Sequence, residues 1–311
     1  MHFRIIKTII RKKLANWIET IDSAELRTLV ERNVIVTGGC IASMALNEPV
    51  NDYDVYFKTK HAAIEVAAYY ASKFREYEPN SRQPEVSTKQ TKNLKGVYES
   101  RVVFFIGSVG SAEATPYVYE EDRYPAEFIE PSELATETDP EGVPSMLKSS
   151  SKHGAYTPVF FSSNAVTLTN DMQIIIRFWG NPAELHENYD FAHCMGSYDY
   201  AADHLEIAPE TMQCLLERSL VYKGSLYPLC TMMRLRKFLS RGWRINAGEM
   251  LKIAANVAQV DFNDPDVLEE QLMGVDASYM LQFIATLRAA LRNGQKITPT
   301  LFSELLDKAY D

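Results

Sequence analysis

Hydrophobic and polar residues follow helical spacing at the start of the chain and in two later segments. The apolar positions of residues 1–21, of 24–33 (AELRTLVERN) and of 60–77 (KHAAIEVAAYYASKFREY) recur at the intervals of an amphipathic helix. Ser23 directly precedes the second segment and is a suitable N-cap for it. The pattern therefore predicts a packed N-terminal helix followed by further helices.

A different pattern lies between the second and third of these helices. A short apolar run at 34–36 predicts a strand, and it is followed by the pair Gly38-Gly39 and a helical turn. A second predicted strand then carries Asp52 and Asp54. The predicted order of elements is therefore helix, strand, glycine turn, helix and strand.

Strand patterns return later in the chain. Residues 97–106 read as a strand, and from Pro158 on the runs PVFFSSNAVTL and MQIIIRFWG predict more, with turns at 162–164 and 170–171. We expect these later strands to extend the sheet that carries the two aspartates. A short helix is predicted at 182–187.

The remaining segments are polar loops or helices. Residues 79–95 lack periodicity and predict a loop, and the acidic segment 120–141 predicts a solvated loop. The last third of the chain has helical patterns throughout. The prediction is an α+β chain: a mixed sheet with flanking helices over 1–205, including a loop-rich insertion at about 79–156, and an all-helical domain over 206–311.

Composition adds limits to this picture. The 311 residues are 46% hydrophobic and 23% charged, which is ordinary for a soluble globular protein. A net charge of −9 argues against a basic coat, although a local basic patch remains compatible with it. No apolar run approaches the ~18 residues of a membrane span. The widely spaced cysteines form no CxxC pair, which predicts a reduced, cytoplasmic protein: Cys40, Cys194, Cys214 and Cys230.

The stretch from Gly38 to Asp54 carries the main candidate chemistry. Alternate residues of a strand share a face, so Asp52 and Asp54 project side by side and a divalent metal would relieve their repulsion. Gly38 and Gly39 allow close approach of backbone to ligand, and the amides of the following helix start suit a phosphate. The stretch predicts transfer chemistry on a nucleotide. The alternative interpretation is a plain loop and an exposed strand.

Gly38-Gly39 with Asp52 and Asp54 resembles the GG…DxD motif of the DNA polymerase β-like nucleotidyltransferase superfamily. The spacing is similar to that of tRNA CCA-adding enzymes and bacterial poly(A) polymerases, whose motif runs GGxVRDxLLGRxxxDxD. Three further positions fit this pattern: Cys40, Ile41 and Leu46.

The chain departs from this motif at two positions. Ala42 and Ser43 stand where the family has Arg and Asp. The resemblance implies that Gly38, Gly39 and Ser43 hold the triphosphate of an NTP substrate. It also implies that the N-terminal part is a nucleotidyltransferase catalytic domain.

A third carboxylate is expected in the segment ENYDFAHC. Asp190-Phe191 resembles the DF of the family motif RRDFTINA, while Asn188 and Tyr189 replace its two Arg and Cys194 its Asn. The apolar neighbours of Asp190 predict a strand with one polar position that faces the site. The resemblance implies that two Mg²⁺ ions are bound by catalytic carboxylates: Asp52, Asp54 and Asp190.

Other interpretations of this segment stay open. Asp190 is an ordinary strand-end residue in the alternative view, and Asp199 and Asp203 are the next candidates for a third carboxylate. His193 falls on the opposite face from Asp190 in a two-residue alternation, which predicts a structural role for the histidine.

A basic segment follows in the helical region. Residues 218–244 contain seven basic residues and no acidic ones, and they loosely resemble the family's basic helix. Arg236, Lys237 and Arg241 are the candidate contacts to triphosphate or RNA backbone. A solvated helix face is the competing interpretation.

Together these observations predict a metal-dependent nucleotidyltransferase that transfers NMP from an NTP to an acceptor hydroxyl. An RNA 3′ end, such as that of a tRNA, is the favoured acceptor. A protein or small-molecule acceptor is the first alternative, and a catalytically degenerate RNA-binding protein the second. No membrane partner is expected.

Overall fold

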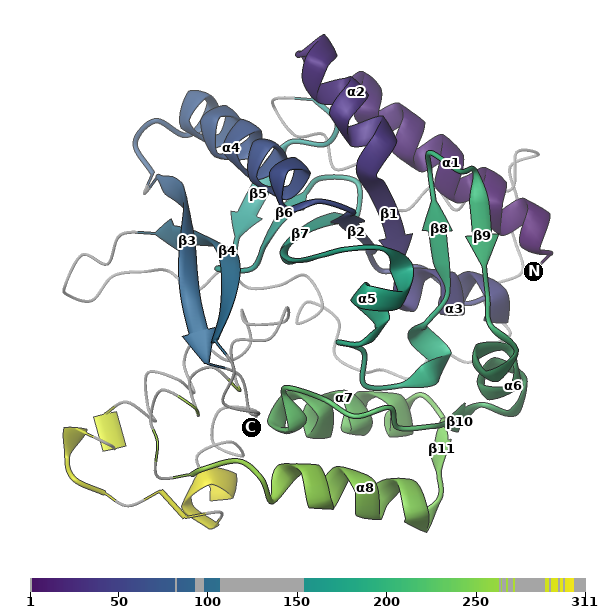
Figure 1. Ribbon diagram of the computed structural model, residues 1–311, viewed down its shortest axis with the longest axis vertical. Coiled ribbons are helices and arrows are strands. Elements are labelled where there is room, and N and C mark those ends of the chain that lie inside the picture. The colour runs from purple at the N-terminus through teal and green to yellow at the C-terminus, as the bar shows by residue number, and fades with distance from the viewer. Residues whose placement is uncertain are drawn as a thin grey trace, which may run out of the picture.

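A mixed seven-stranded sheet forms the centre of the protein, as a computed structural model shows (Figure 1). The structure describes residues 2–81, 83–92, 98–106 and 154–262, and beyond these only positions 264, 267, 271, 289, 290, 292–295, 297, 298 and 300–304. The strand order is β5-β6-β7-β2-β1-β8-β9. The strands are β1 (Val34–Thr37), β2 (Tyr53–Phe57), β5 (Pro158–Phe161), β6 (Ala165–Leu168), β7 (Met172–Trp179), β8 (Ser197–Asp199) and β9 (His204–Glu206).

The sheet joins the early strands to the later ones. β2 pairs in parallel with β7, with Asp54 opposite Gln173, whereas the other neighbours are antiparallel. The prediction that strands after Pro158 extend the sheet of Asp54 is therefore confirmed. The predicted turn between β6 and β7 is also present, with Asn170 and Asp171 both at positive φ (63° and 53°).

One face of the sheet is covered by the N-terminal helices (Figure 1). Val34, Val36 and Val55 point into this core, where they meet Ile10 and Leu14 of the first helix. Ser23 caps the second helix by accepting from Leu26 N, as predicted. The helices are α1 (Phe3–Glu19), α2 (Ala24–Asn33) and α4 (Lys60–Tyr77), so all of the predicted N-terminal helices are confirmed.

The opposite face carries the alternate strand residues. Ile35, Tyr56 and Ile175 pack there against Leu185 of α5 (Pro182–His186). α5 begins with a capping box in which Asn181 accepts from Glu184 N. Asp54 has the same strand parity as Tyr56, so the sequence period of two places its carboxylate on the α5 side of the sheet.

The predicted loop at 79–95 is wrong. β3 (Pro84–Lys92) pairs with β4 (Tyr98–Ile106) as a separate antiparallel ribbon. β4 was predicted, but β3 is mainly polar and exposed, so it has no hydrophobic alternation to reveal it. The remainder of the expected insertion, residues 107–153 with the acidic segment, lies outside the described residues.

The described part of the C-terminal region is helical except for one short ribbon. Its helices are α6 (Pro209–Glu217), α7 (Pro228–Ser240) and α8 (Ala247–Val257). β10 (Ser219–Leu220) and β11 (Arg244–Ile245) pair in parallel, which the sequence did not predict. Most of the helices expected after residue 262 lie outside the described residues. The α+β class is confirmed.

A second core links this helical region to the sheet. α3 (Gly39–Leu46) contributes Ala42, which packs in one cluster with Phe191, Leu215 and Trp243. Figure 1 shows α7 and α8 below the sheet, on the side away from α1 and α2. None of the described helices is long and apolar enough to cross a membrane.

Candidate active site

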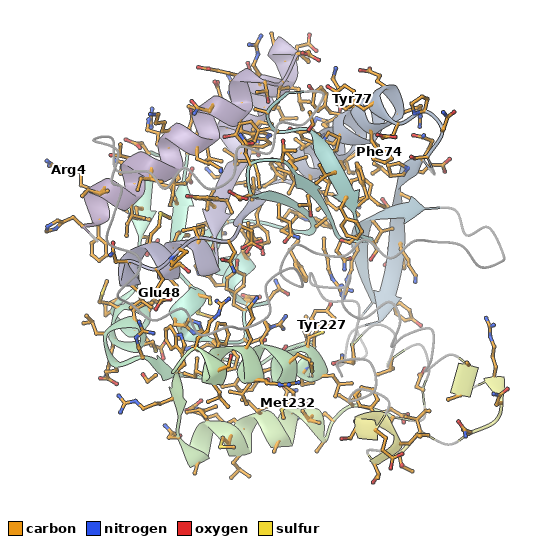
Figure 2. All side chains as sticks on the ribbon, turned by 180° about the vertical axis from the view of Figure 1, so that it is seen from behind. Arg4, Glu48, Phe74, Tyr77, Tyr227 and Met232 are labelled. Atoms are coloured by element: carbon orange, nitrogen blue, oxygen red, sulfur yellow. The ribbon has the colours of Figure 1, made fainter. Side chains whose placement is uncertain are left out.

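A cavity of about 270 Å³ lies between the sheet and α7. Figure 2 shows two of its lining residues, Glu48 just after α3 and Tyr227 directly before α7. Every candidate site residue predicted from the sequence lines it except Arg236: Gly38, Gly39, Ser43, Asp52, Asp54, Asp190, Lys237 and Arg241.

Gly38 and the carboxylate of Asp54 lie side by side in the lining of this cavity. Gly38 has φ 109°, and a Cβ added there would lie 3.0 Å from Asp54 Oδ2 and 3.5 Å from Tyr189 Oη. Only glycine combines this backbone conformation with such a close carboxylate. Gly39 starts α3 next to this contact, and a Cβ added at Gly39 meets nothing within 4 Å. The glycine pair and the second aspartate therefore form one local unit.

The two aspartates of the DxD sequence differ in exposure. Asp52 is exposed and directly precedes β2, whereas Asp54 is half-buried within the strand. Carboxylate oxygens are the ligands that Mg²⁺ prefers, so this pair fits a divalent metal chemically. Among the residues that the structure describes, however, no group of three or more His, Cys, Asp or Glu side chains is placed to hold a metal.

Asp190 is held by an ion pair. Its Oδ2 accepts from Arg234 Nε at 2.6 Å, and the Asp190 side chain is 5% exposed while that of Arg234 is 29% exposed. The strand predicted around Asp190 is not formed: the residue lies in a bend before a short 3₁₀ helix (Ala192–Cys194). Only the neighbouring Phe191 makes a bridge, to Tyr222.

α7 places a row of cations along the cavity. Arg234, Lys237 and Arg241 line it, because positions three, four and seven apart share one face of a helix. Arg236 lies about half a turn away, is exposed and does not line the cavity. Arg234 is one of the seven basic residues in 218–244, and its spacing of three to Lys237 was the sequence signal for its place on this face.

A further cation that lines the cavity, Arg177, was not singled out from the sequence. Arg177 of β7 lines the cavity at 3% exposure, donates to the Tyr227 hydroxyl and lies with its guanidinium 4.4 Å from that ring's centroid. Arg101 of β4 lies 5.6 Å from the centroid of the same ring. Burial lowers the pKa of Arg177 to about 10. A lone arginine inside an apolar strand was the sequence signal.

His193 and Cys194 lie within hydrogen-bond distance of each other, with Cys194 Sγ 3.2 Å from His193 Nε2. His193 is 2% exposed between the rings of Phe238 and Trp243, with centroids at 4.4 and 4.1 Å. Burial lowers the pKa of His193 to about 3 and raises that of Cys194 to about 12, so the thiol stays protonated at neutral pH. His193 therefore packs among aromatic rings and also lines the cavity, and its structural role stays a prediction.

The alternative carboxylates lie elsewhere. Asp199 forms an ion pair with Lys58 at 2.6 Å, and Asp203 with Lys7 and Arg11, both at 2.9 Å. Neither aspartate lines the cavity. Asp190 is the carboxylate from this part of the chain that does.

The fold and cavity define an α+β protein in which a glycine turn, a carboxylate-bearing strand and a cationic helix meet at one site. The model of one family, described as "Gad2: Gabija anti-defense 2 family protein", matches residues 8–218. The chain belongs to this Gabija anti-defense 2 family. The matched range includes Gly38, Asp54 and Asp190 and ends before α7.

A curated relative supports the same assignment. "Gabija anti-defense 2" of Bacillus phage SPbetaL7 is 19% identical over 103 residues, which are 33% of this chain. The matched part spans only 26% of that protein's length.

Solved structures of CCA-adding enzymes share low similarity with this chain. One is the Thermotoga maritima CCA-adding enzyme complexed with tRNA-CCA, at 12% identity, a TM-score of 0.35, and 93% and 57% coverage of the two chains. Another is a CCA-adding enzyme with CTP, at 14% identity, a TM-score of 0.38, and 93% and 54% coverage. This chain spans little more than half of the length of those proteins.

Proposed function

We propose that this protein is a metal-dependent nucleotidyltransferase that transfers NMP from an NTP to a hydroxyl of an acceptor. The observation that carries the proposal is the position of Asp54 Oδ2 beside Gly38, only 3.0 Å from where a Cβ would stand, in a cavity that cations of α7 also line. A phosphate cradle, a carboxylate pair and positive charge within one cavity are the parts that nucleotidyl transfer requires.

The chain's own residues mainly bind and orient. Asp52 and Asp54 would hold Mg²⁺, which in such a reaction activates the acceptor hydroxyl and neutralises the leaving pyrophosphate. The backbone at Gly38 and Gly39, together with Ser43, would bind the triphosphate, because glycines have no side chain to keep a ligand from the backbone amides and the Cβ position at Gly39 is open. Lys237 and Arg241 face the same cavity from α7 and would complete the anion site.

The acceptor that we propose is a protein hydroxyl. The family is named for opposing the Gabija defence, and its curated relative belongs to a Bacillus phage. Nucleotidylation of a defence protein would connect the chemistry of the cavity to that name. The proposal thus takes up the protein acceptor that the sequence left as an alternative.

The proposal is tested by incubating the purified protein with each α-³²P-labelled NTP, Mg²⁺ and an extract of Gabija-containing cells. We expect label on protein, and loss of roughly 10²-fold or more of the transfer in Asp54→Asn. Asp199→Asn is the matched control, because it makes the same change outside the cavity and should retain transfer. Full transfer by Asp54→Asn would refute the proposal.

An RNA 3′ end is the second candidate acceptor. The cationic face of α7 favours it, since Arg234, Lys237 and Arg241 also suit a phosphodiester backbone. Adding total RNA to the same reaction separates the two acceptors. Label in the nuclease-sensitive fraction, with none on protein, would replace the protein acceptor by RNA.

A further inference from the structure

We infer that Asp190 is a positioning residue that aims Arg234 at the nucleotide triphosphate, and that it is not a ligand of the catalytic metal. The inference rests on the proposed function, because it assigns residues within the same cavity. It also reassigns the one carboxylate that the family resemblance placed with Asp52 and Asp54.

The backbone around Asp190 is fixed independently of Arg234. Lys223 N donates to Asp190 O at 2.8 Å, and Ala192 N donates to Val221 O at 3.0 Å. The segment is therefore tied on both sides to the strand-like run before α7. A carboxylate anchored in this way provides a fixed point for a long, flexible side chain such as arginine.

The ion pair is buried at its acidic end and open at its basic end. Asp190 is 5% exposed, whereas Arg234 is 29% exposed and lines the cavity with Lys237 and Arg241. A guanidinium carries five N–H donors in a rigid fork, so the bond from Nε to Asp190 Oδ2 fixes the direction of the remaining donors. Asn188 and Tyr189 beside Asp190 are neutral, so α7 supplies the positive charge on this side.

The same contact opposes a metal at Asp190. A guanidinium nitrogen 2.6 Å from one carboxylate oxygen would repel a divalent cation bound to that carboxylate. The repulsion grows with the charge of the ion and with the low dielectric of a buried site. The geometry thus favours Arg234 as the partner of Asp190.

Binding measurements test this without relying on turnover. The probes are Mn²⁺ alone and α,β-methylene-ATP with Mg²⁺, each titrated by calorimetry into wild type, Asp190→Asn, Arg234→Gln, the double variant and Asp54→Asn. We expect Asp190→Asn and Arg234→Gln each to weaken binding of the analogue about tenfold, and the double variant to lose no more than either single one. Mn²⁺ affinity should fall in Asp54→Asn and stay unchanged in Asp190→Asn.

Two results would overturn the inference. One is a loss of Mn²⁺ affinity in Asp190→Asn equal to that in Asp54→Asn, and the other is an unchanged analogue affinity in Arg234→Gln. Arg234→Gln keeps the test decisive if Asp190→Asn fails to fold, and partial recovery of analogue binding in Arg234→Lys would support a role in charge placement. If Asp54→Asn loses transfer and one of these two results is also found, the proposed function stands. Only the assignment of Asp190 as a positioning residue then fails.

Discussion

At the scale of single residues, the site depends on one close approach of backbone to carboxylate. Because Gly38 has no Cβ, Asp54 Oδ2 can lie beside it without steric conflict, and neither residue would reveal this role alone. The sequence predicted their proximity because a glycine pair and an alternating DxD strand have known local geometries. The Asp190–Arg234 pair was not predicted, since its partners lie 44 positions apart and no local pattern joins them.

Replacing Gly38 by alanine should damage both stability and transfer. The new Cβ would meet Asp54 Oδ2 at 3.0 Å while the backbone stays at φ 109°, so we expect a loss of about 1–3 kcal/mol in the free energy of unfolding. Urea denaturation measures this loss. Gly39→Ala is the matched control and should be neutral or slightly stabilising, because its Cβ meets nothing within 4 Å. Equal effects of the two substitutions would contradict the explanation.

His193 should make the protein less stable in mild acid. Burial lowers the pKa of His193 from 6.5 to about 3, so between these values the unfolded chain binds a proton that the folded chain excludes. Stability therefore falls as pH drops below 6.5, by about 2 kcal/mol at pH 5 relative to pH 7.5. We expect His193→Gln to lose this part of the pH dependence of the unfolding free energy.

The exposed His61 provides the comparison for that experiment. Its side chain is 71% exposed, so His61→Gln makes the same chemical change outside the core and serves as the matched control. A wild-type slope in His193→Gln would show that other groups account for the acid sensitivity.

At the scale of elements, the sequence predicted those whose hydrophobic period is complete. α2, α4 and β1 lie where the pattern placed them: the helices turn apolar residues toward the core, and all four residues of β1 are buried. β3 was missed because its stability comes from pairing with β4 in an exposed ribbon, which leaves no periodic signal. The strand predicted at Asp190 is not formed. Its apolar neighbour Phe191 packs instead in a cluster with residues of the helical region.

The cations of α7 that line the cavity should contribute more to nucleotide binding than Arg236, which does not line it. Lys237→Gln and Arg241→Gln should each weaken binding of α,β-methylene-ATP by roughly 3- to 10-fold, because both side chains line the cavity. Calorimetry in low and high salt measures the effect, which salt should reduce. Arg236→Gln makes an equivalent charge change on the exposed face and should bind as wild type does. Equal losses at all three positions would point to long-range charge alone.

At the scale of the whole molecule, the predicted boundary at 205/206 is crossed by a shared core. Ala42 and Phe191 from the first part pack with Leu215 and Trp243 from the second. Arg218 also pairs with Glu48 at 2.6 Å across the same boundary. These contacts predict that the sheet and the described helical region unfold together.

Cooperative unfolding can be measured with Trp243 as a local reporter. The chain has three tryptophans, so the variant with Trp17→Phe and Trp179→Phe retains only Trp243, which is 5% exposed in the shared core. We expect its fluorescence and the far-UV circular dichroism to change at the same urea concentration. A fluorescence midpoint well below that of circular dichroism would establish two independently unfolding parts.

The distribution of the cavity's walls along the chain has a consequence for protein synthesis. Gly38 and Asp54 leave the ribosome early, whereas Arg234 and Trp243, which line the other side, follow about two hundred positions later. A nascent chain that has folded its first strands still lacks Arg234 and the other cations of α7 that line the cavity. The complete cavity can therefore form only after α7 has emerged and docked, so a shorter nascent chain would lack part of the proposed nucleotide site.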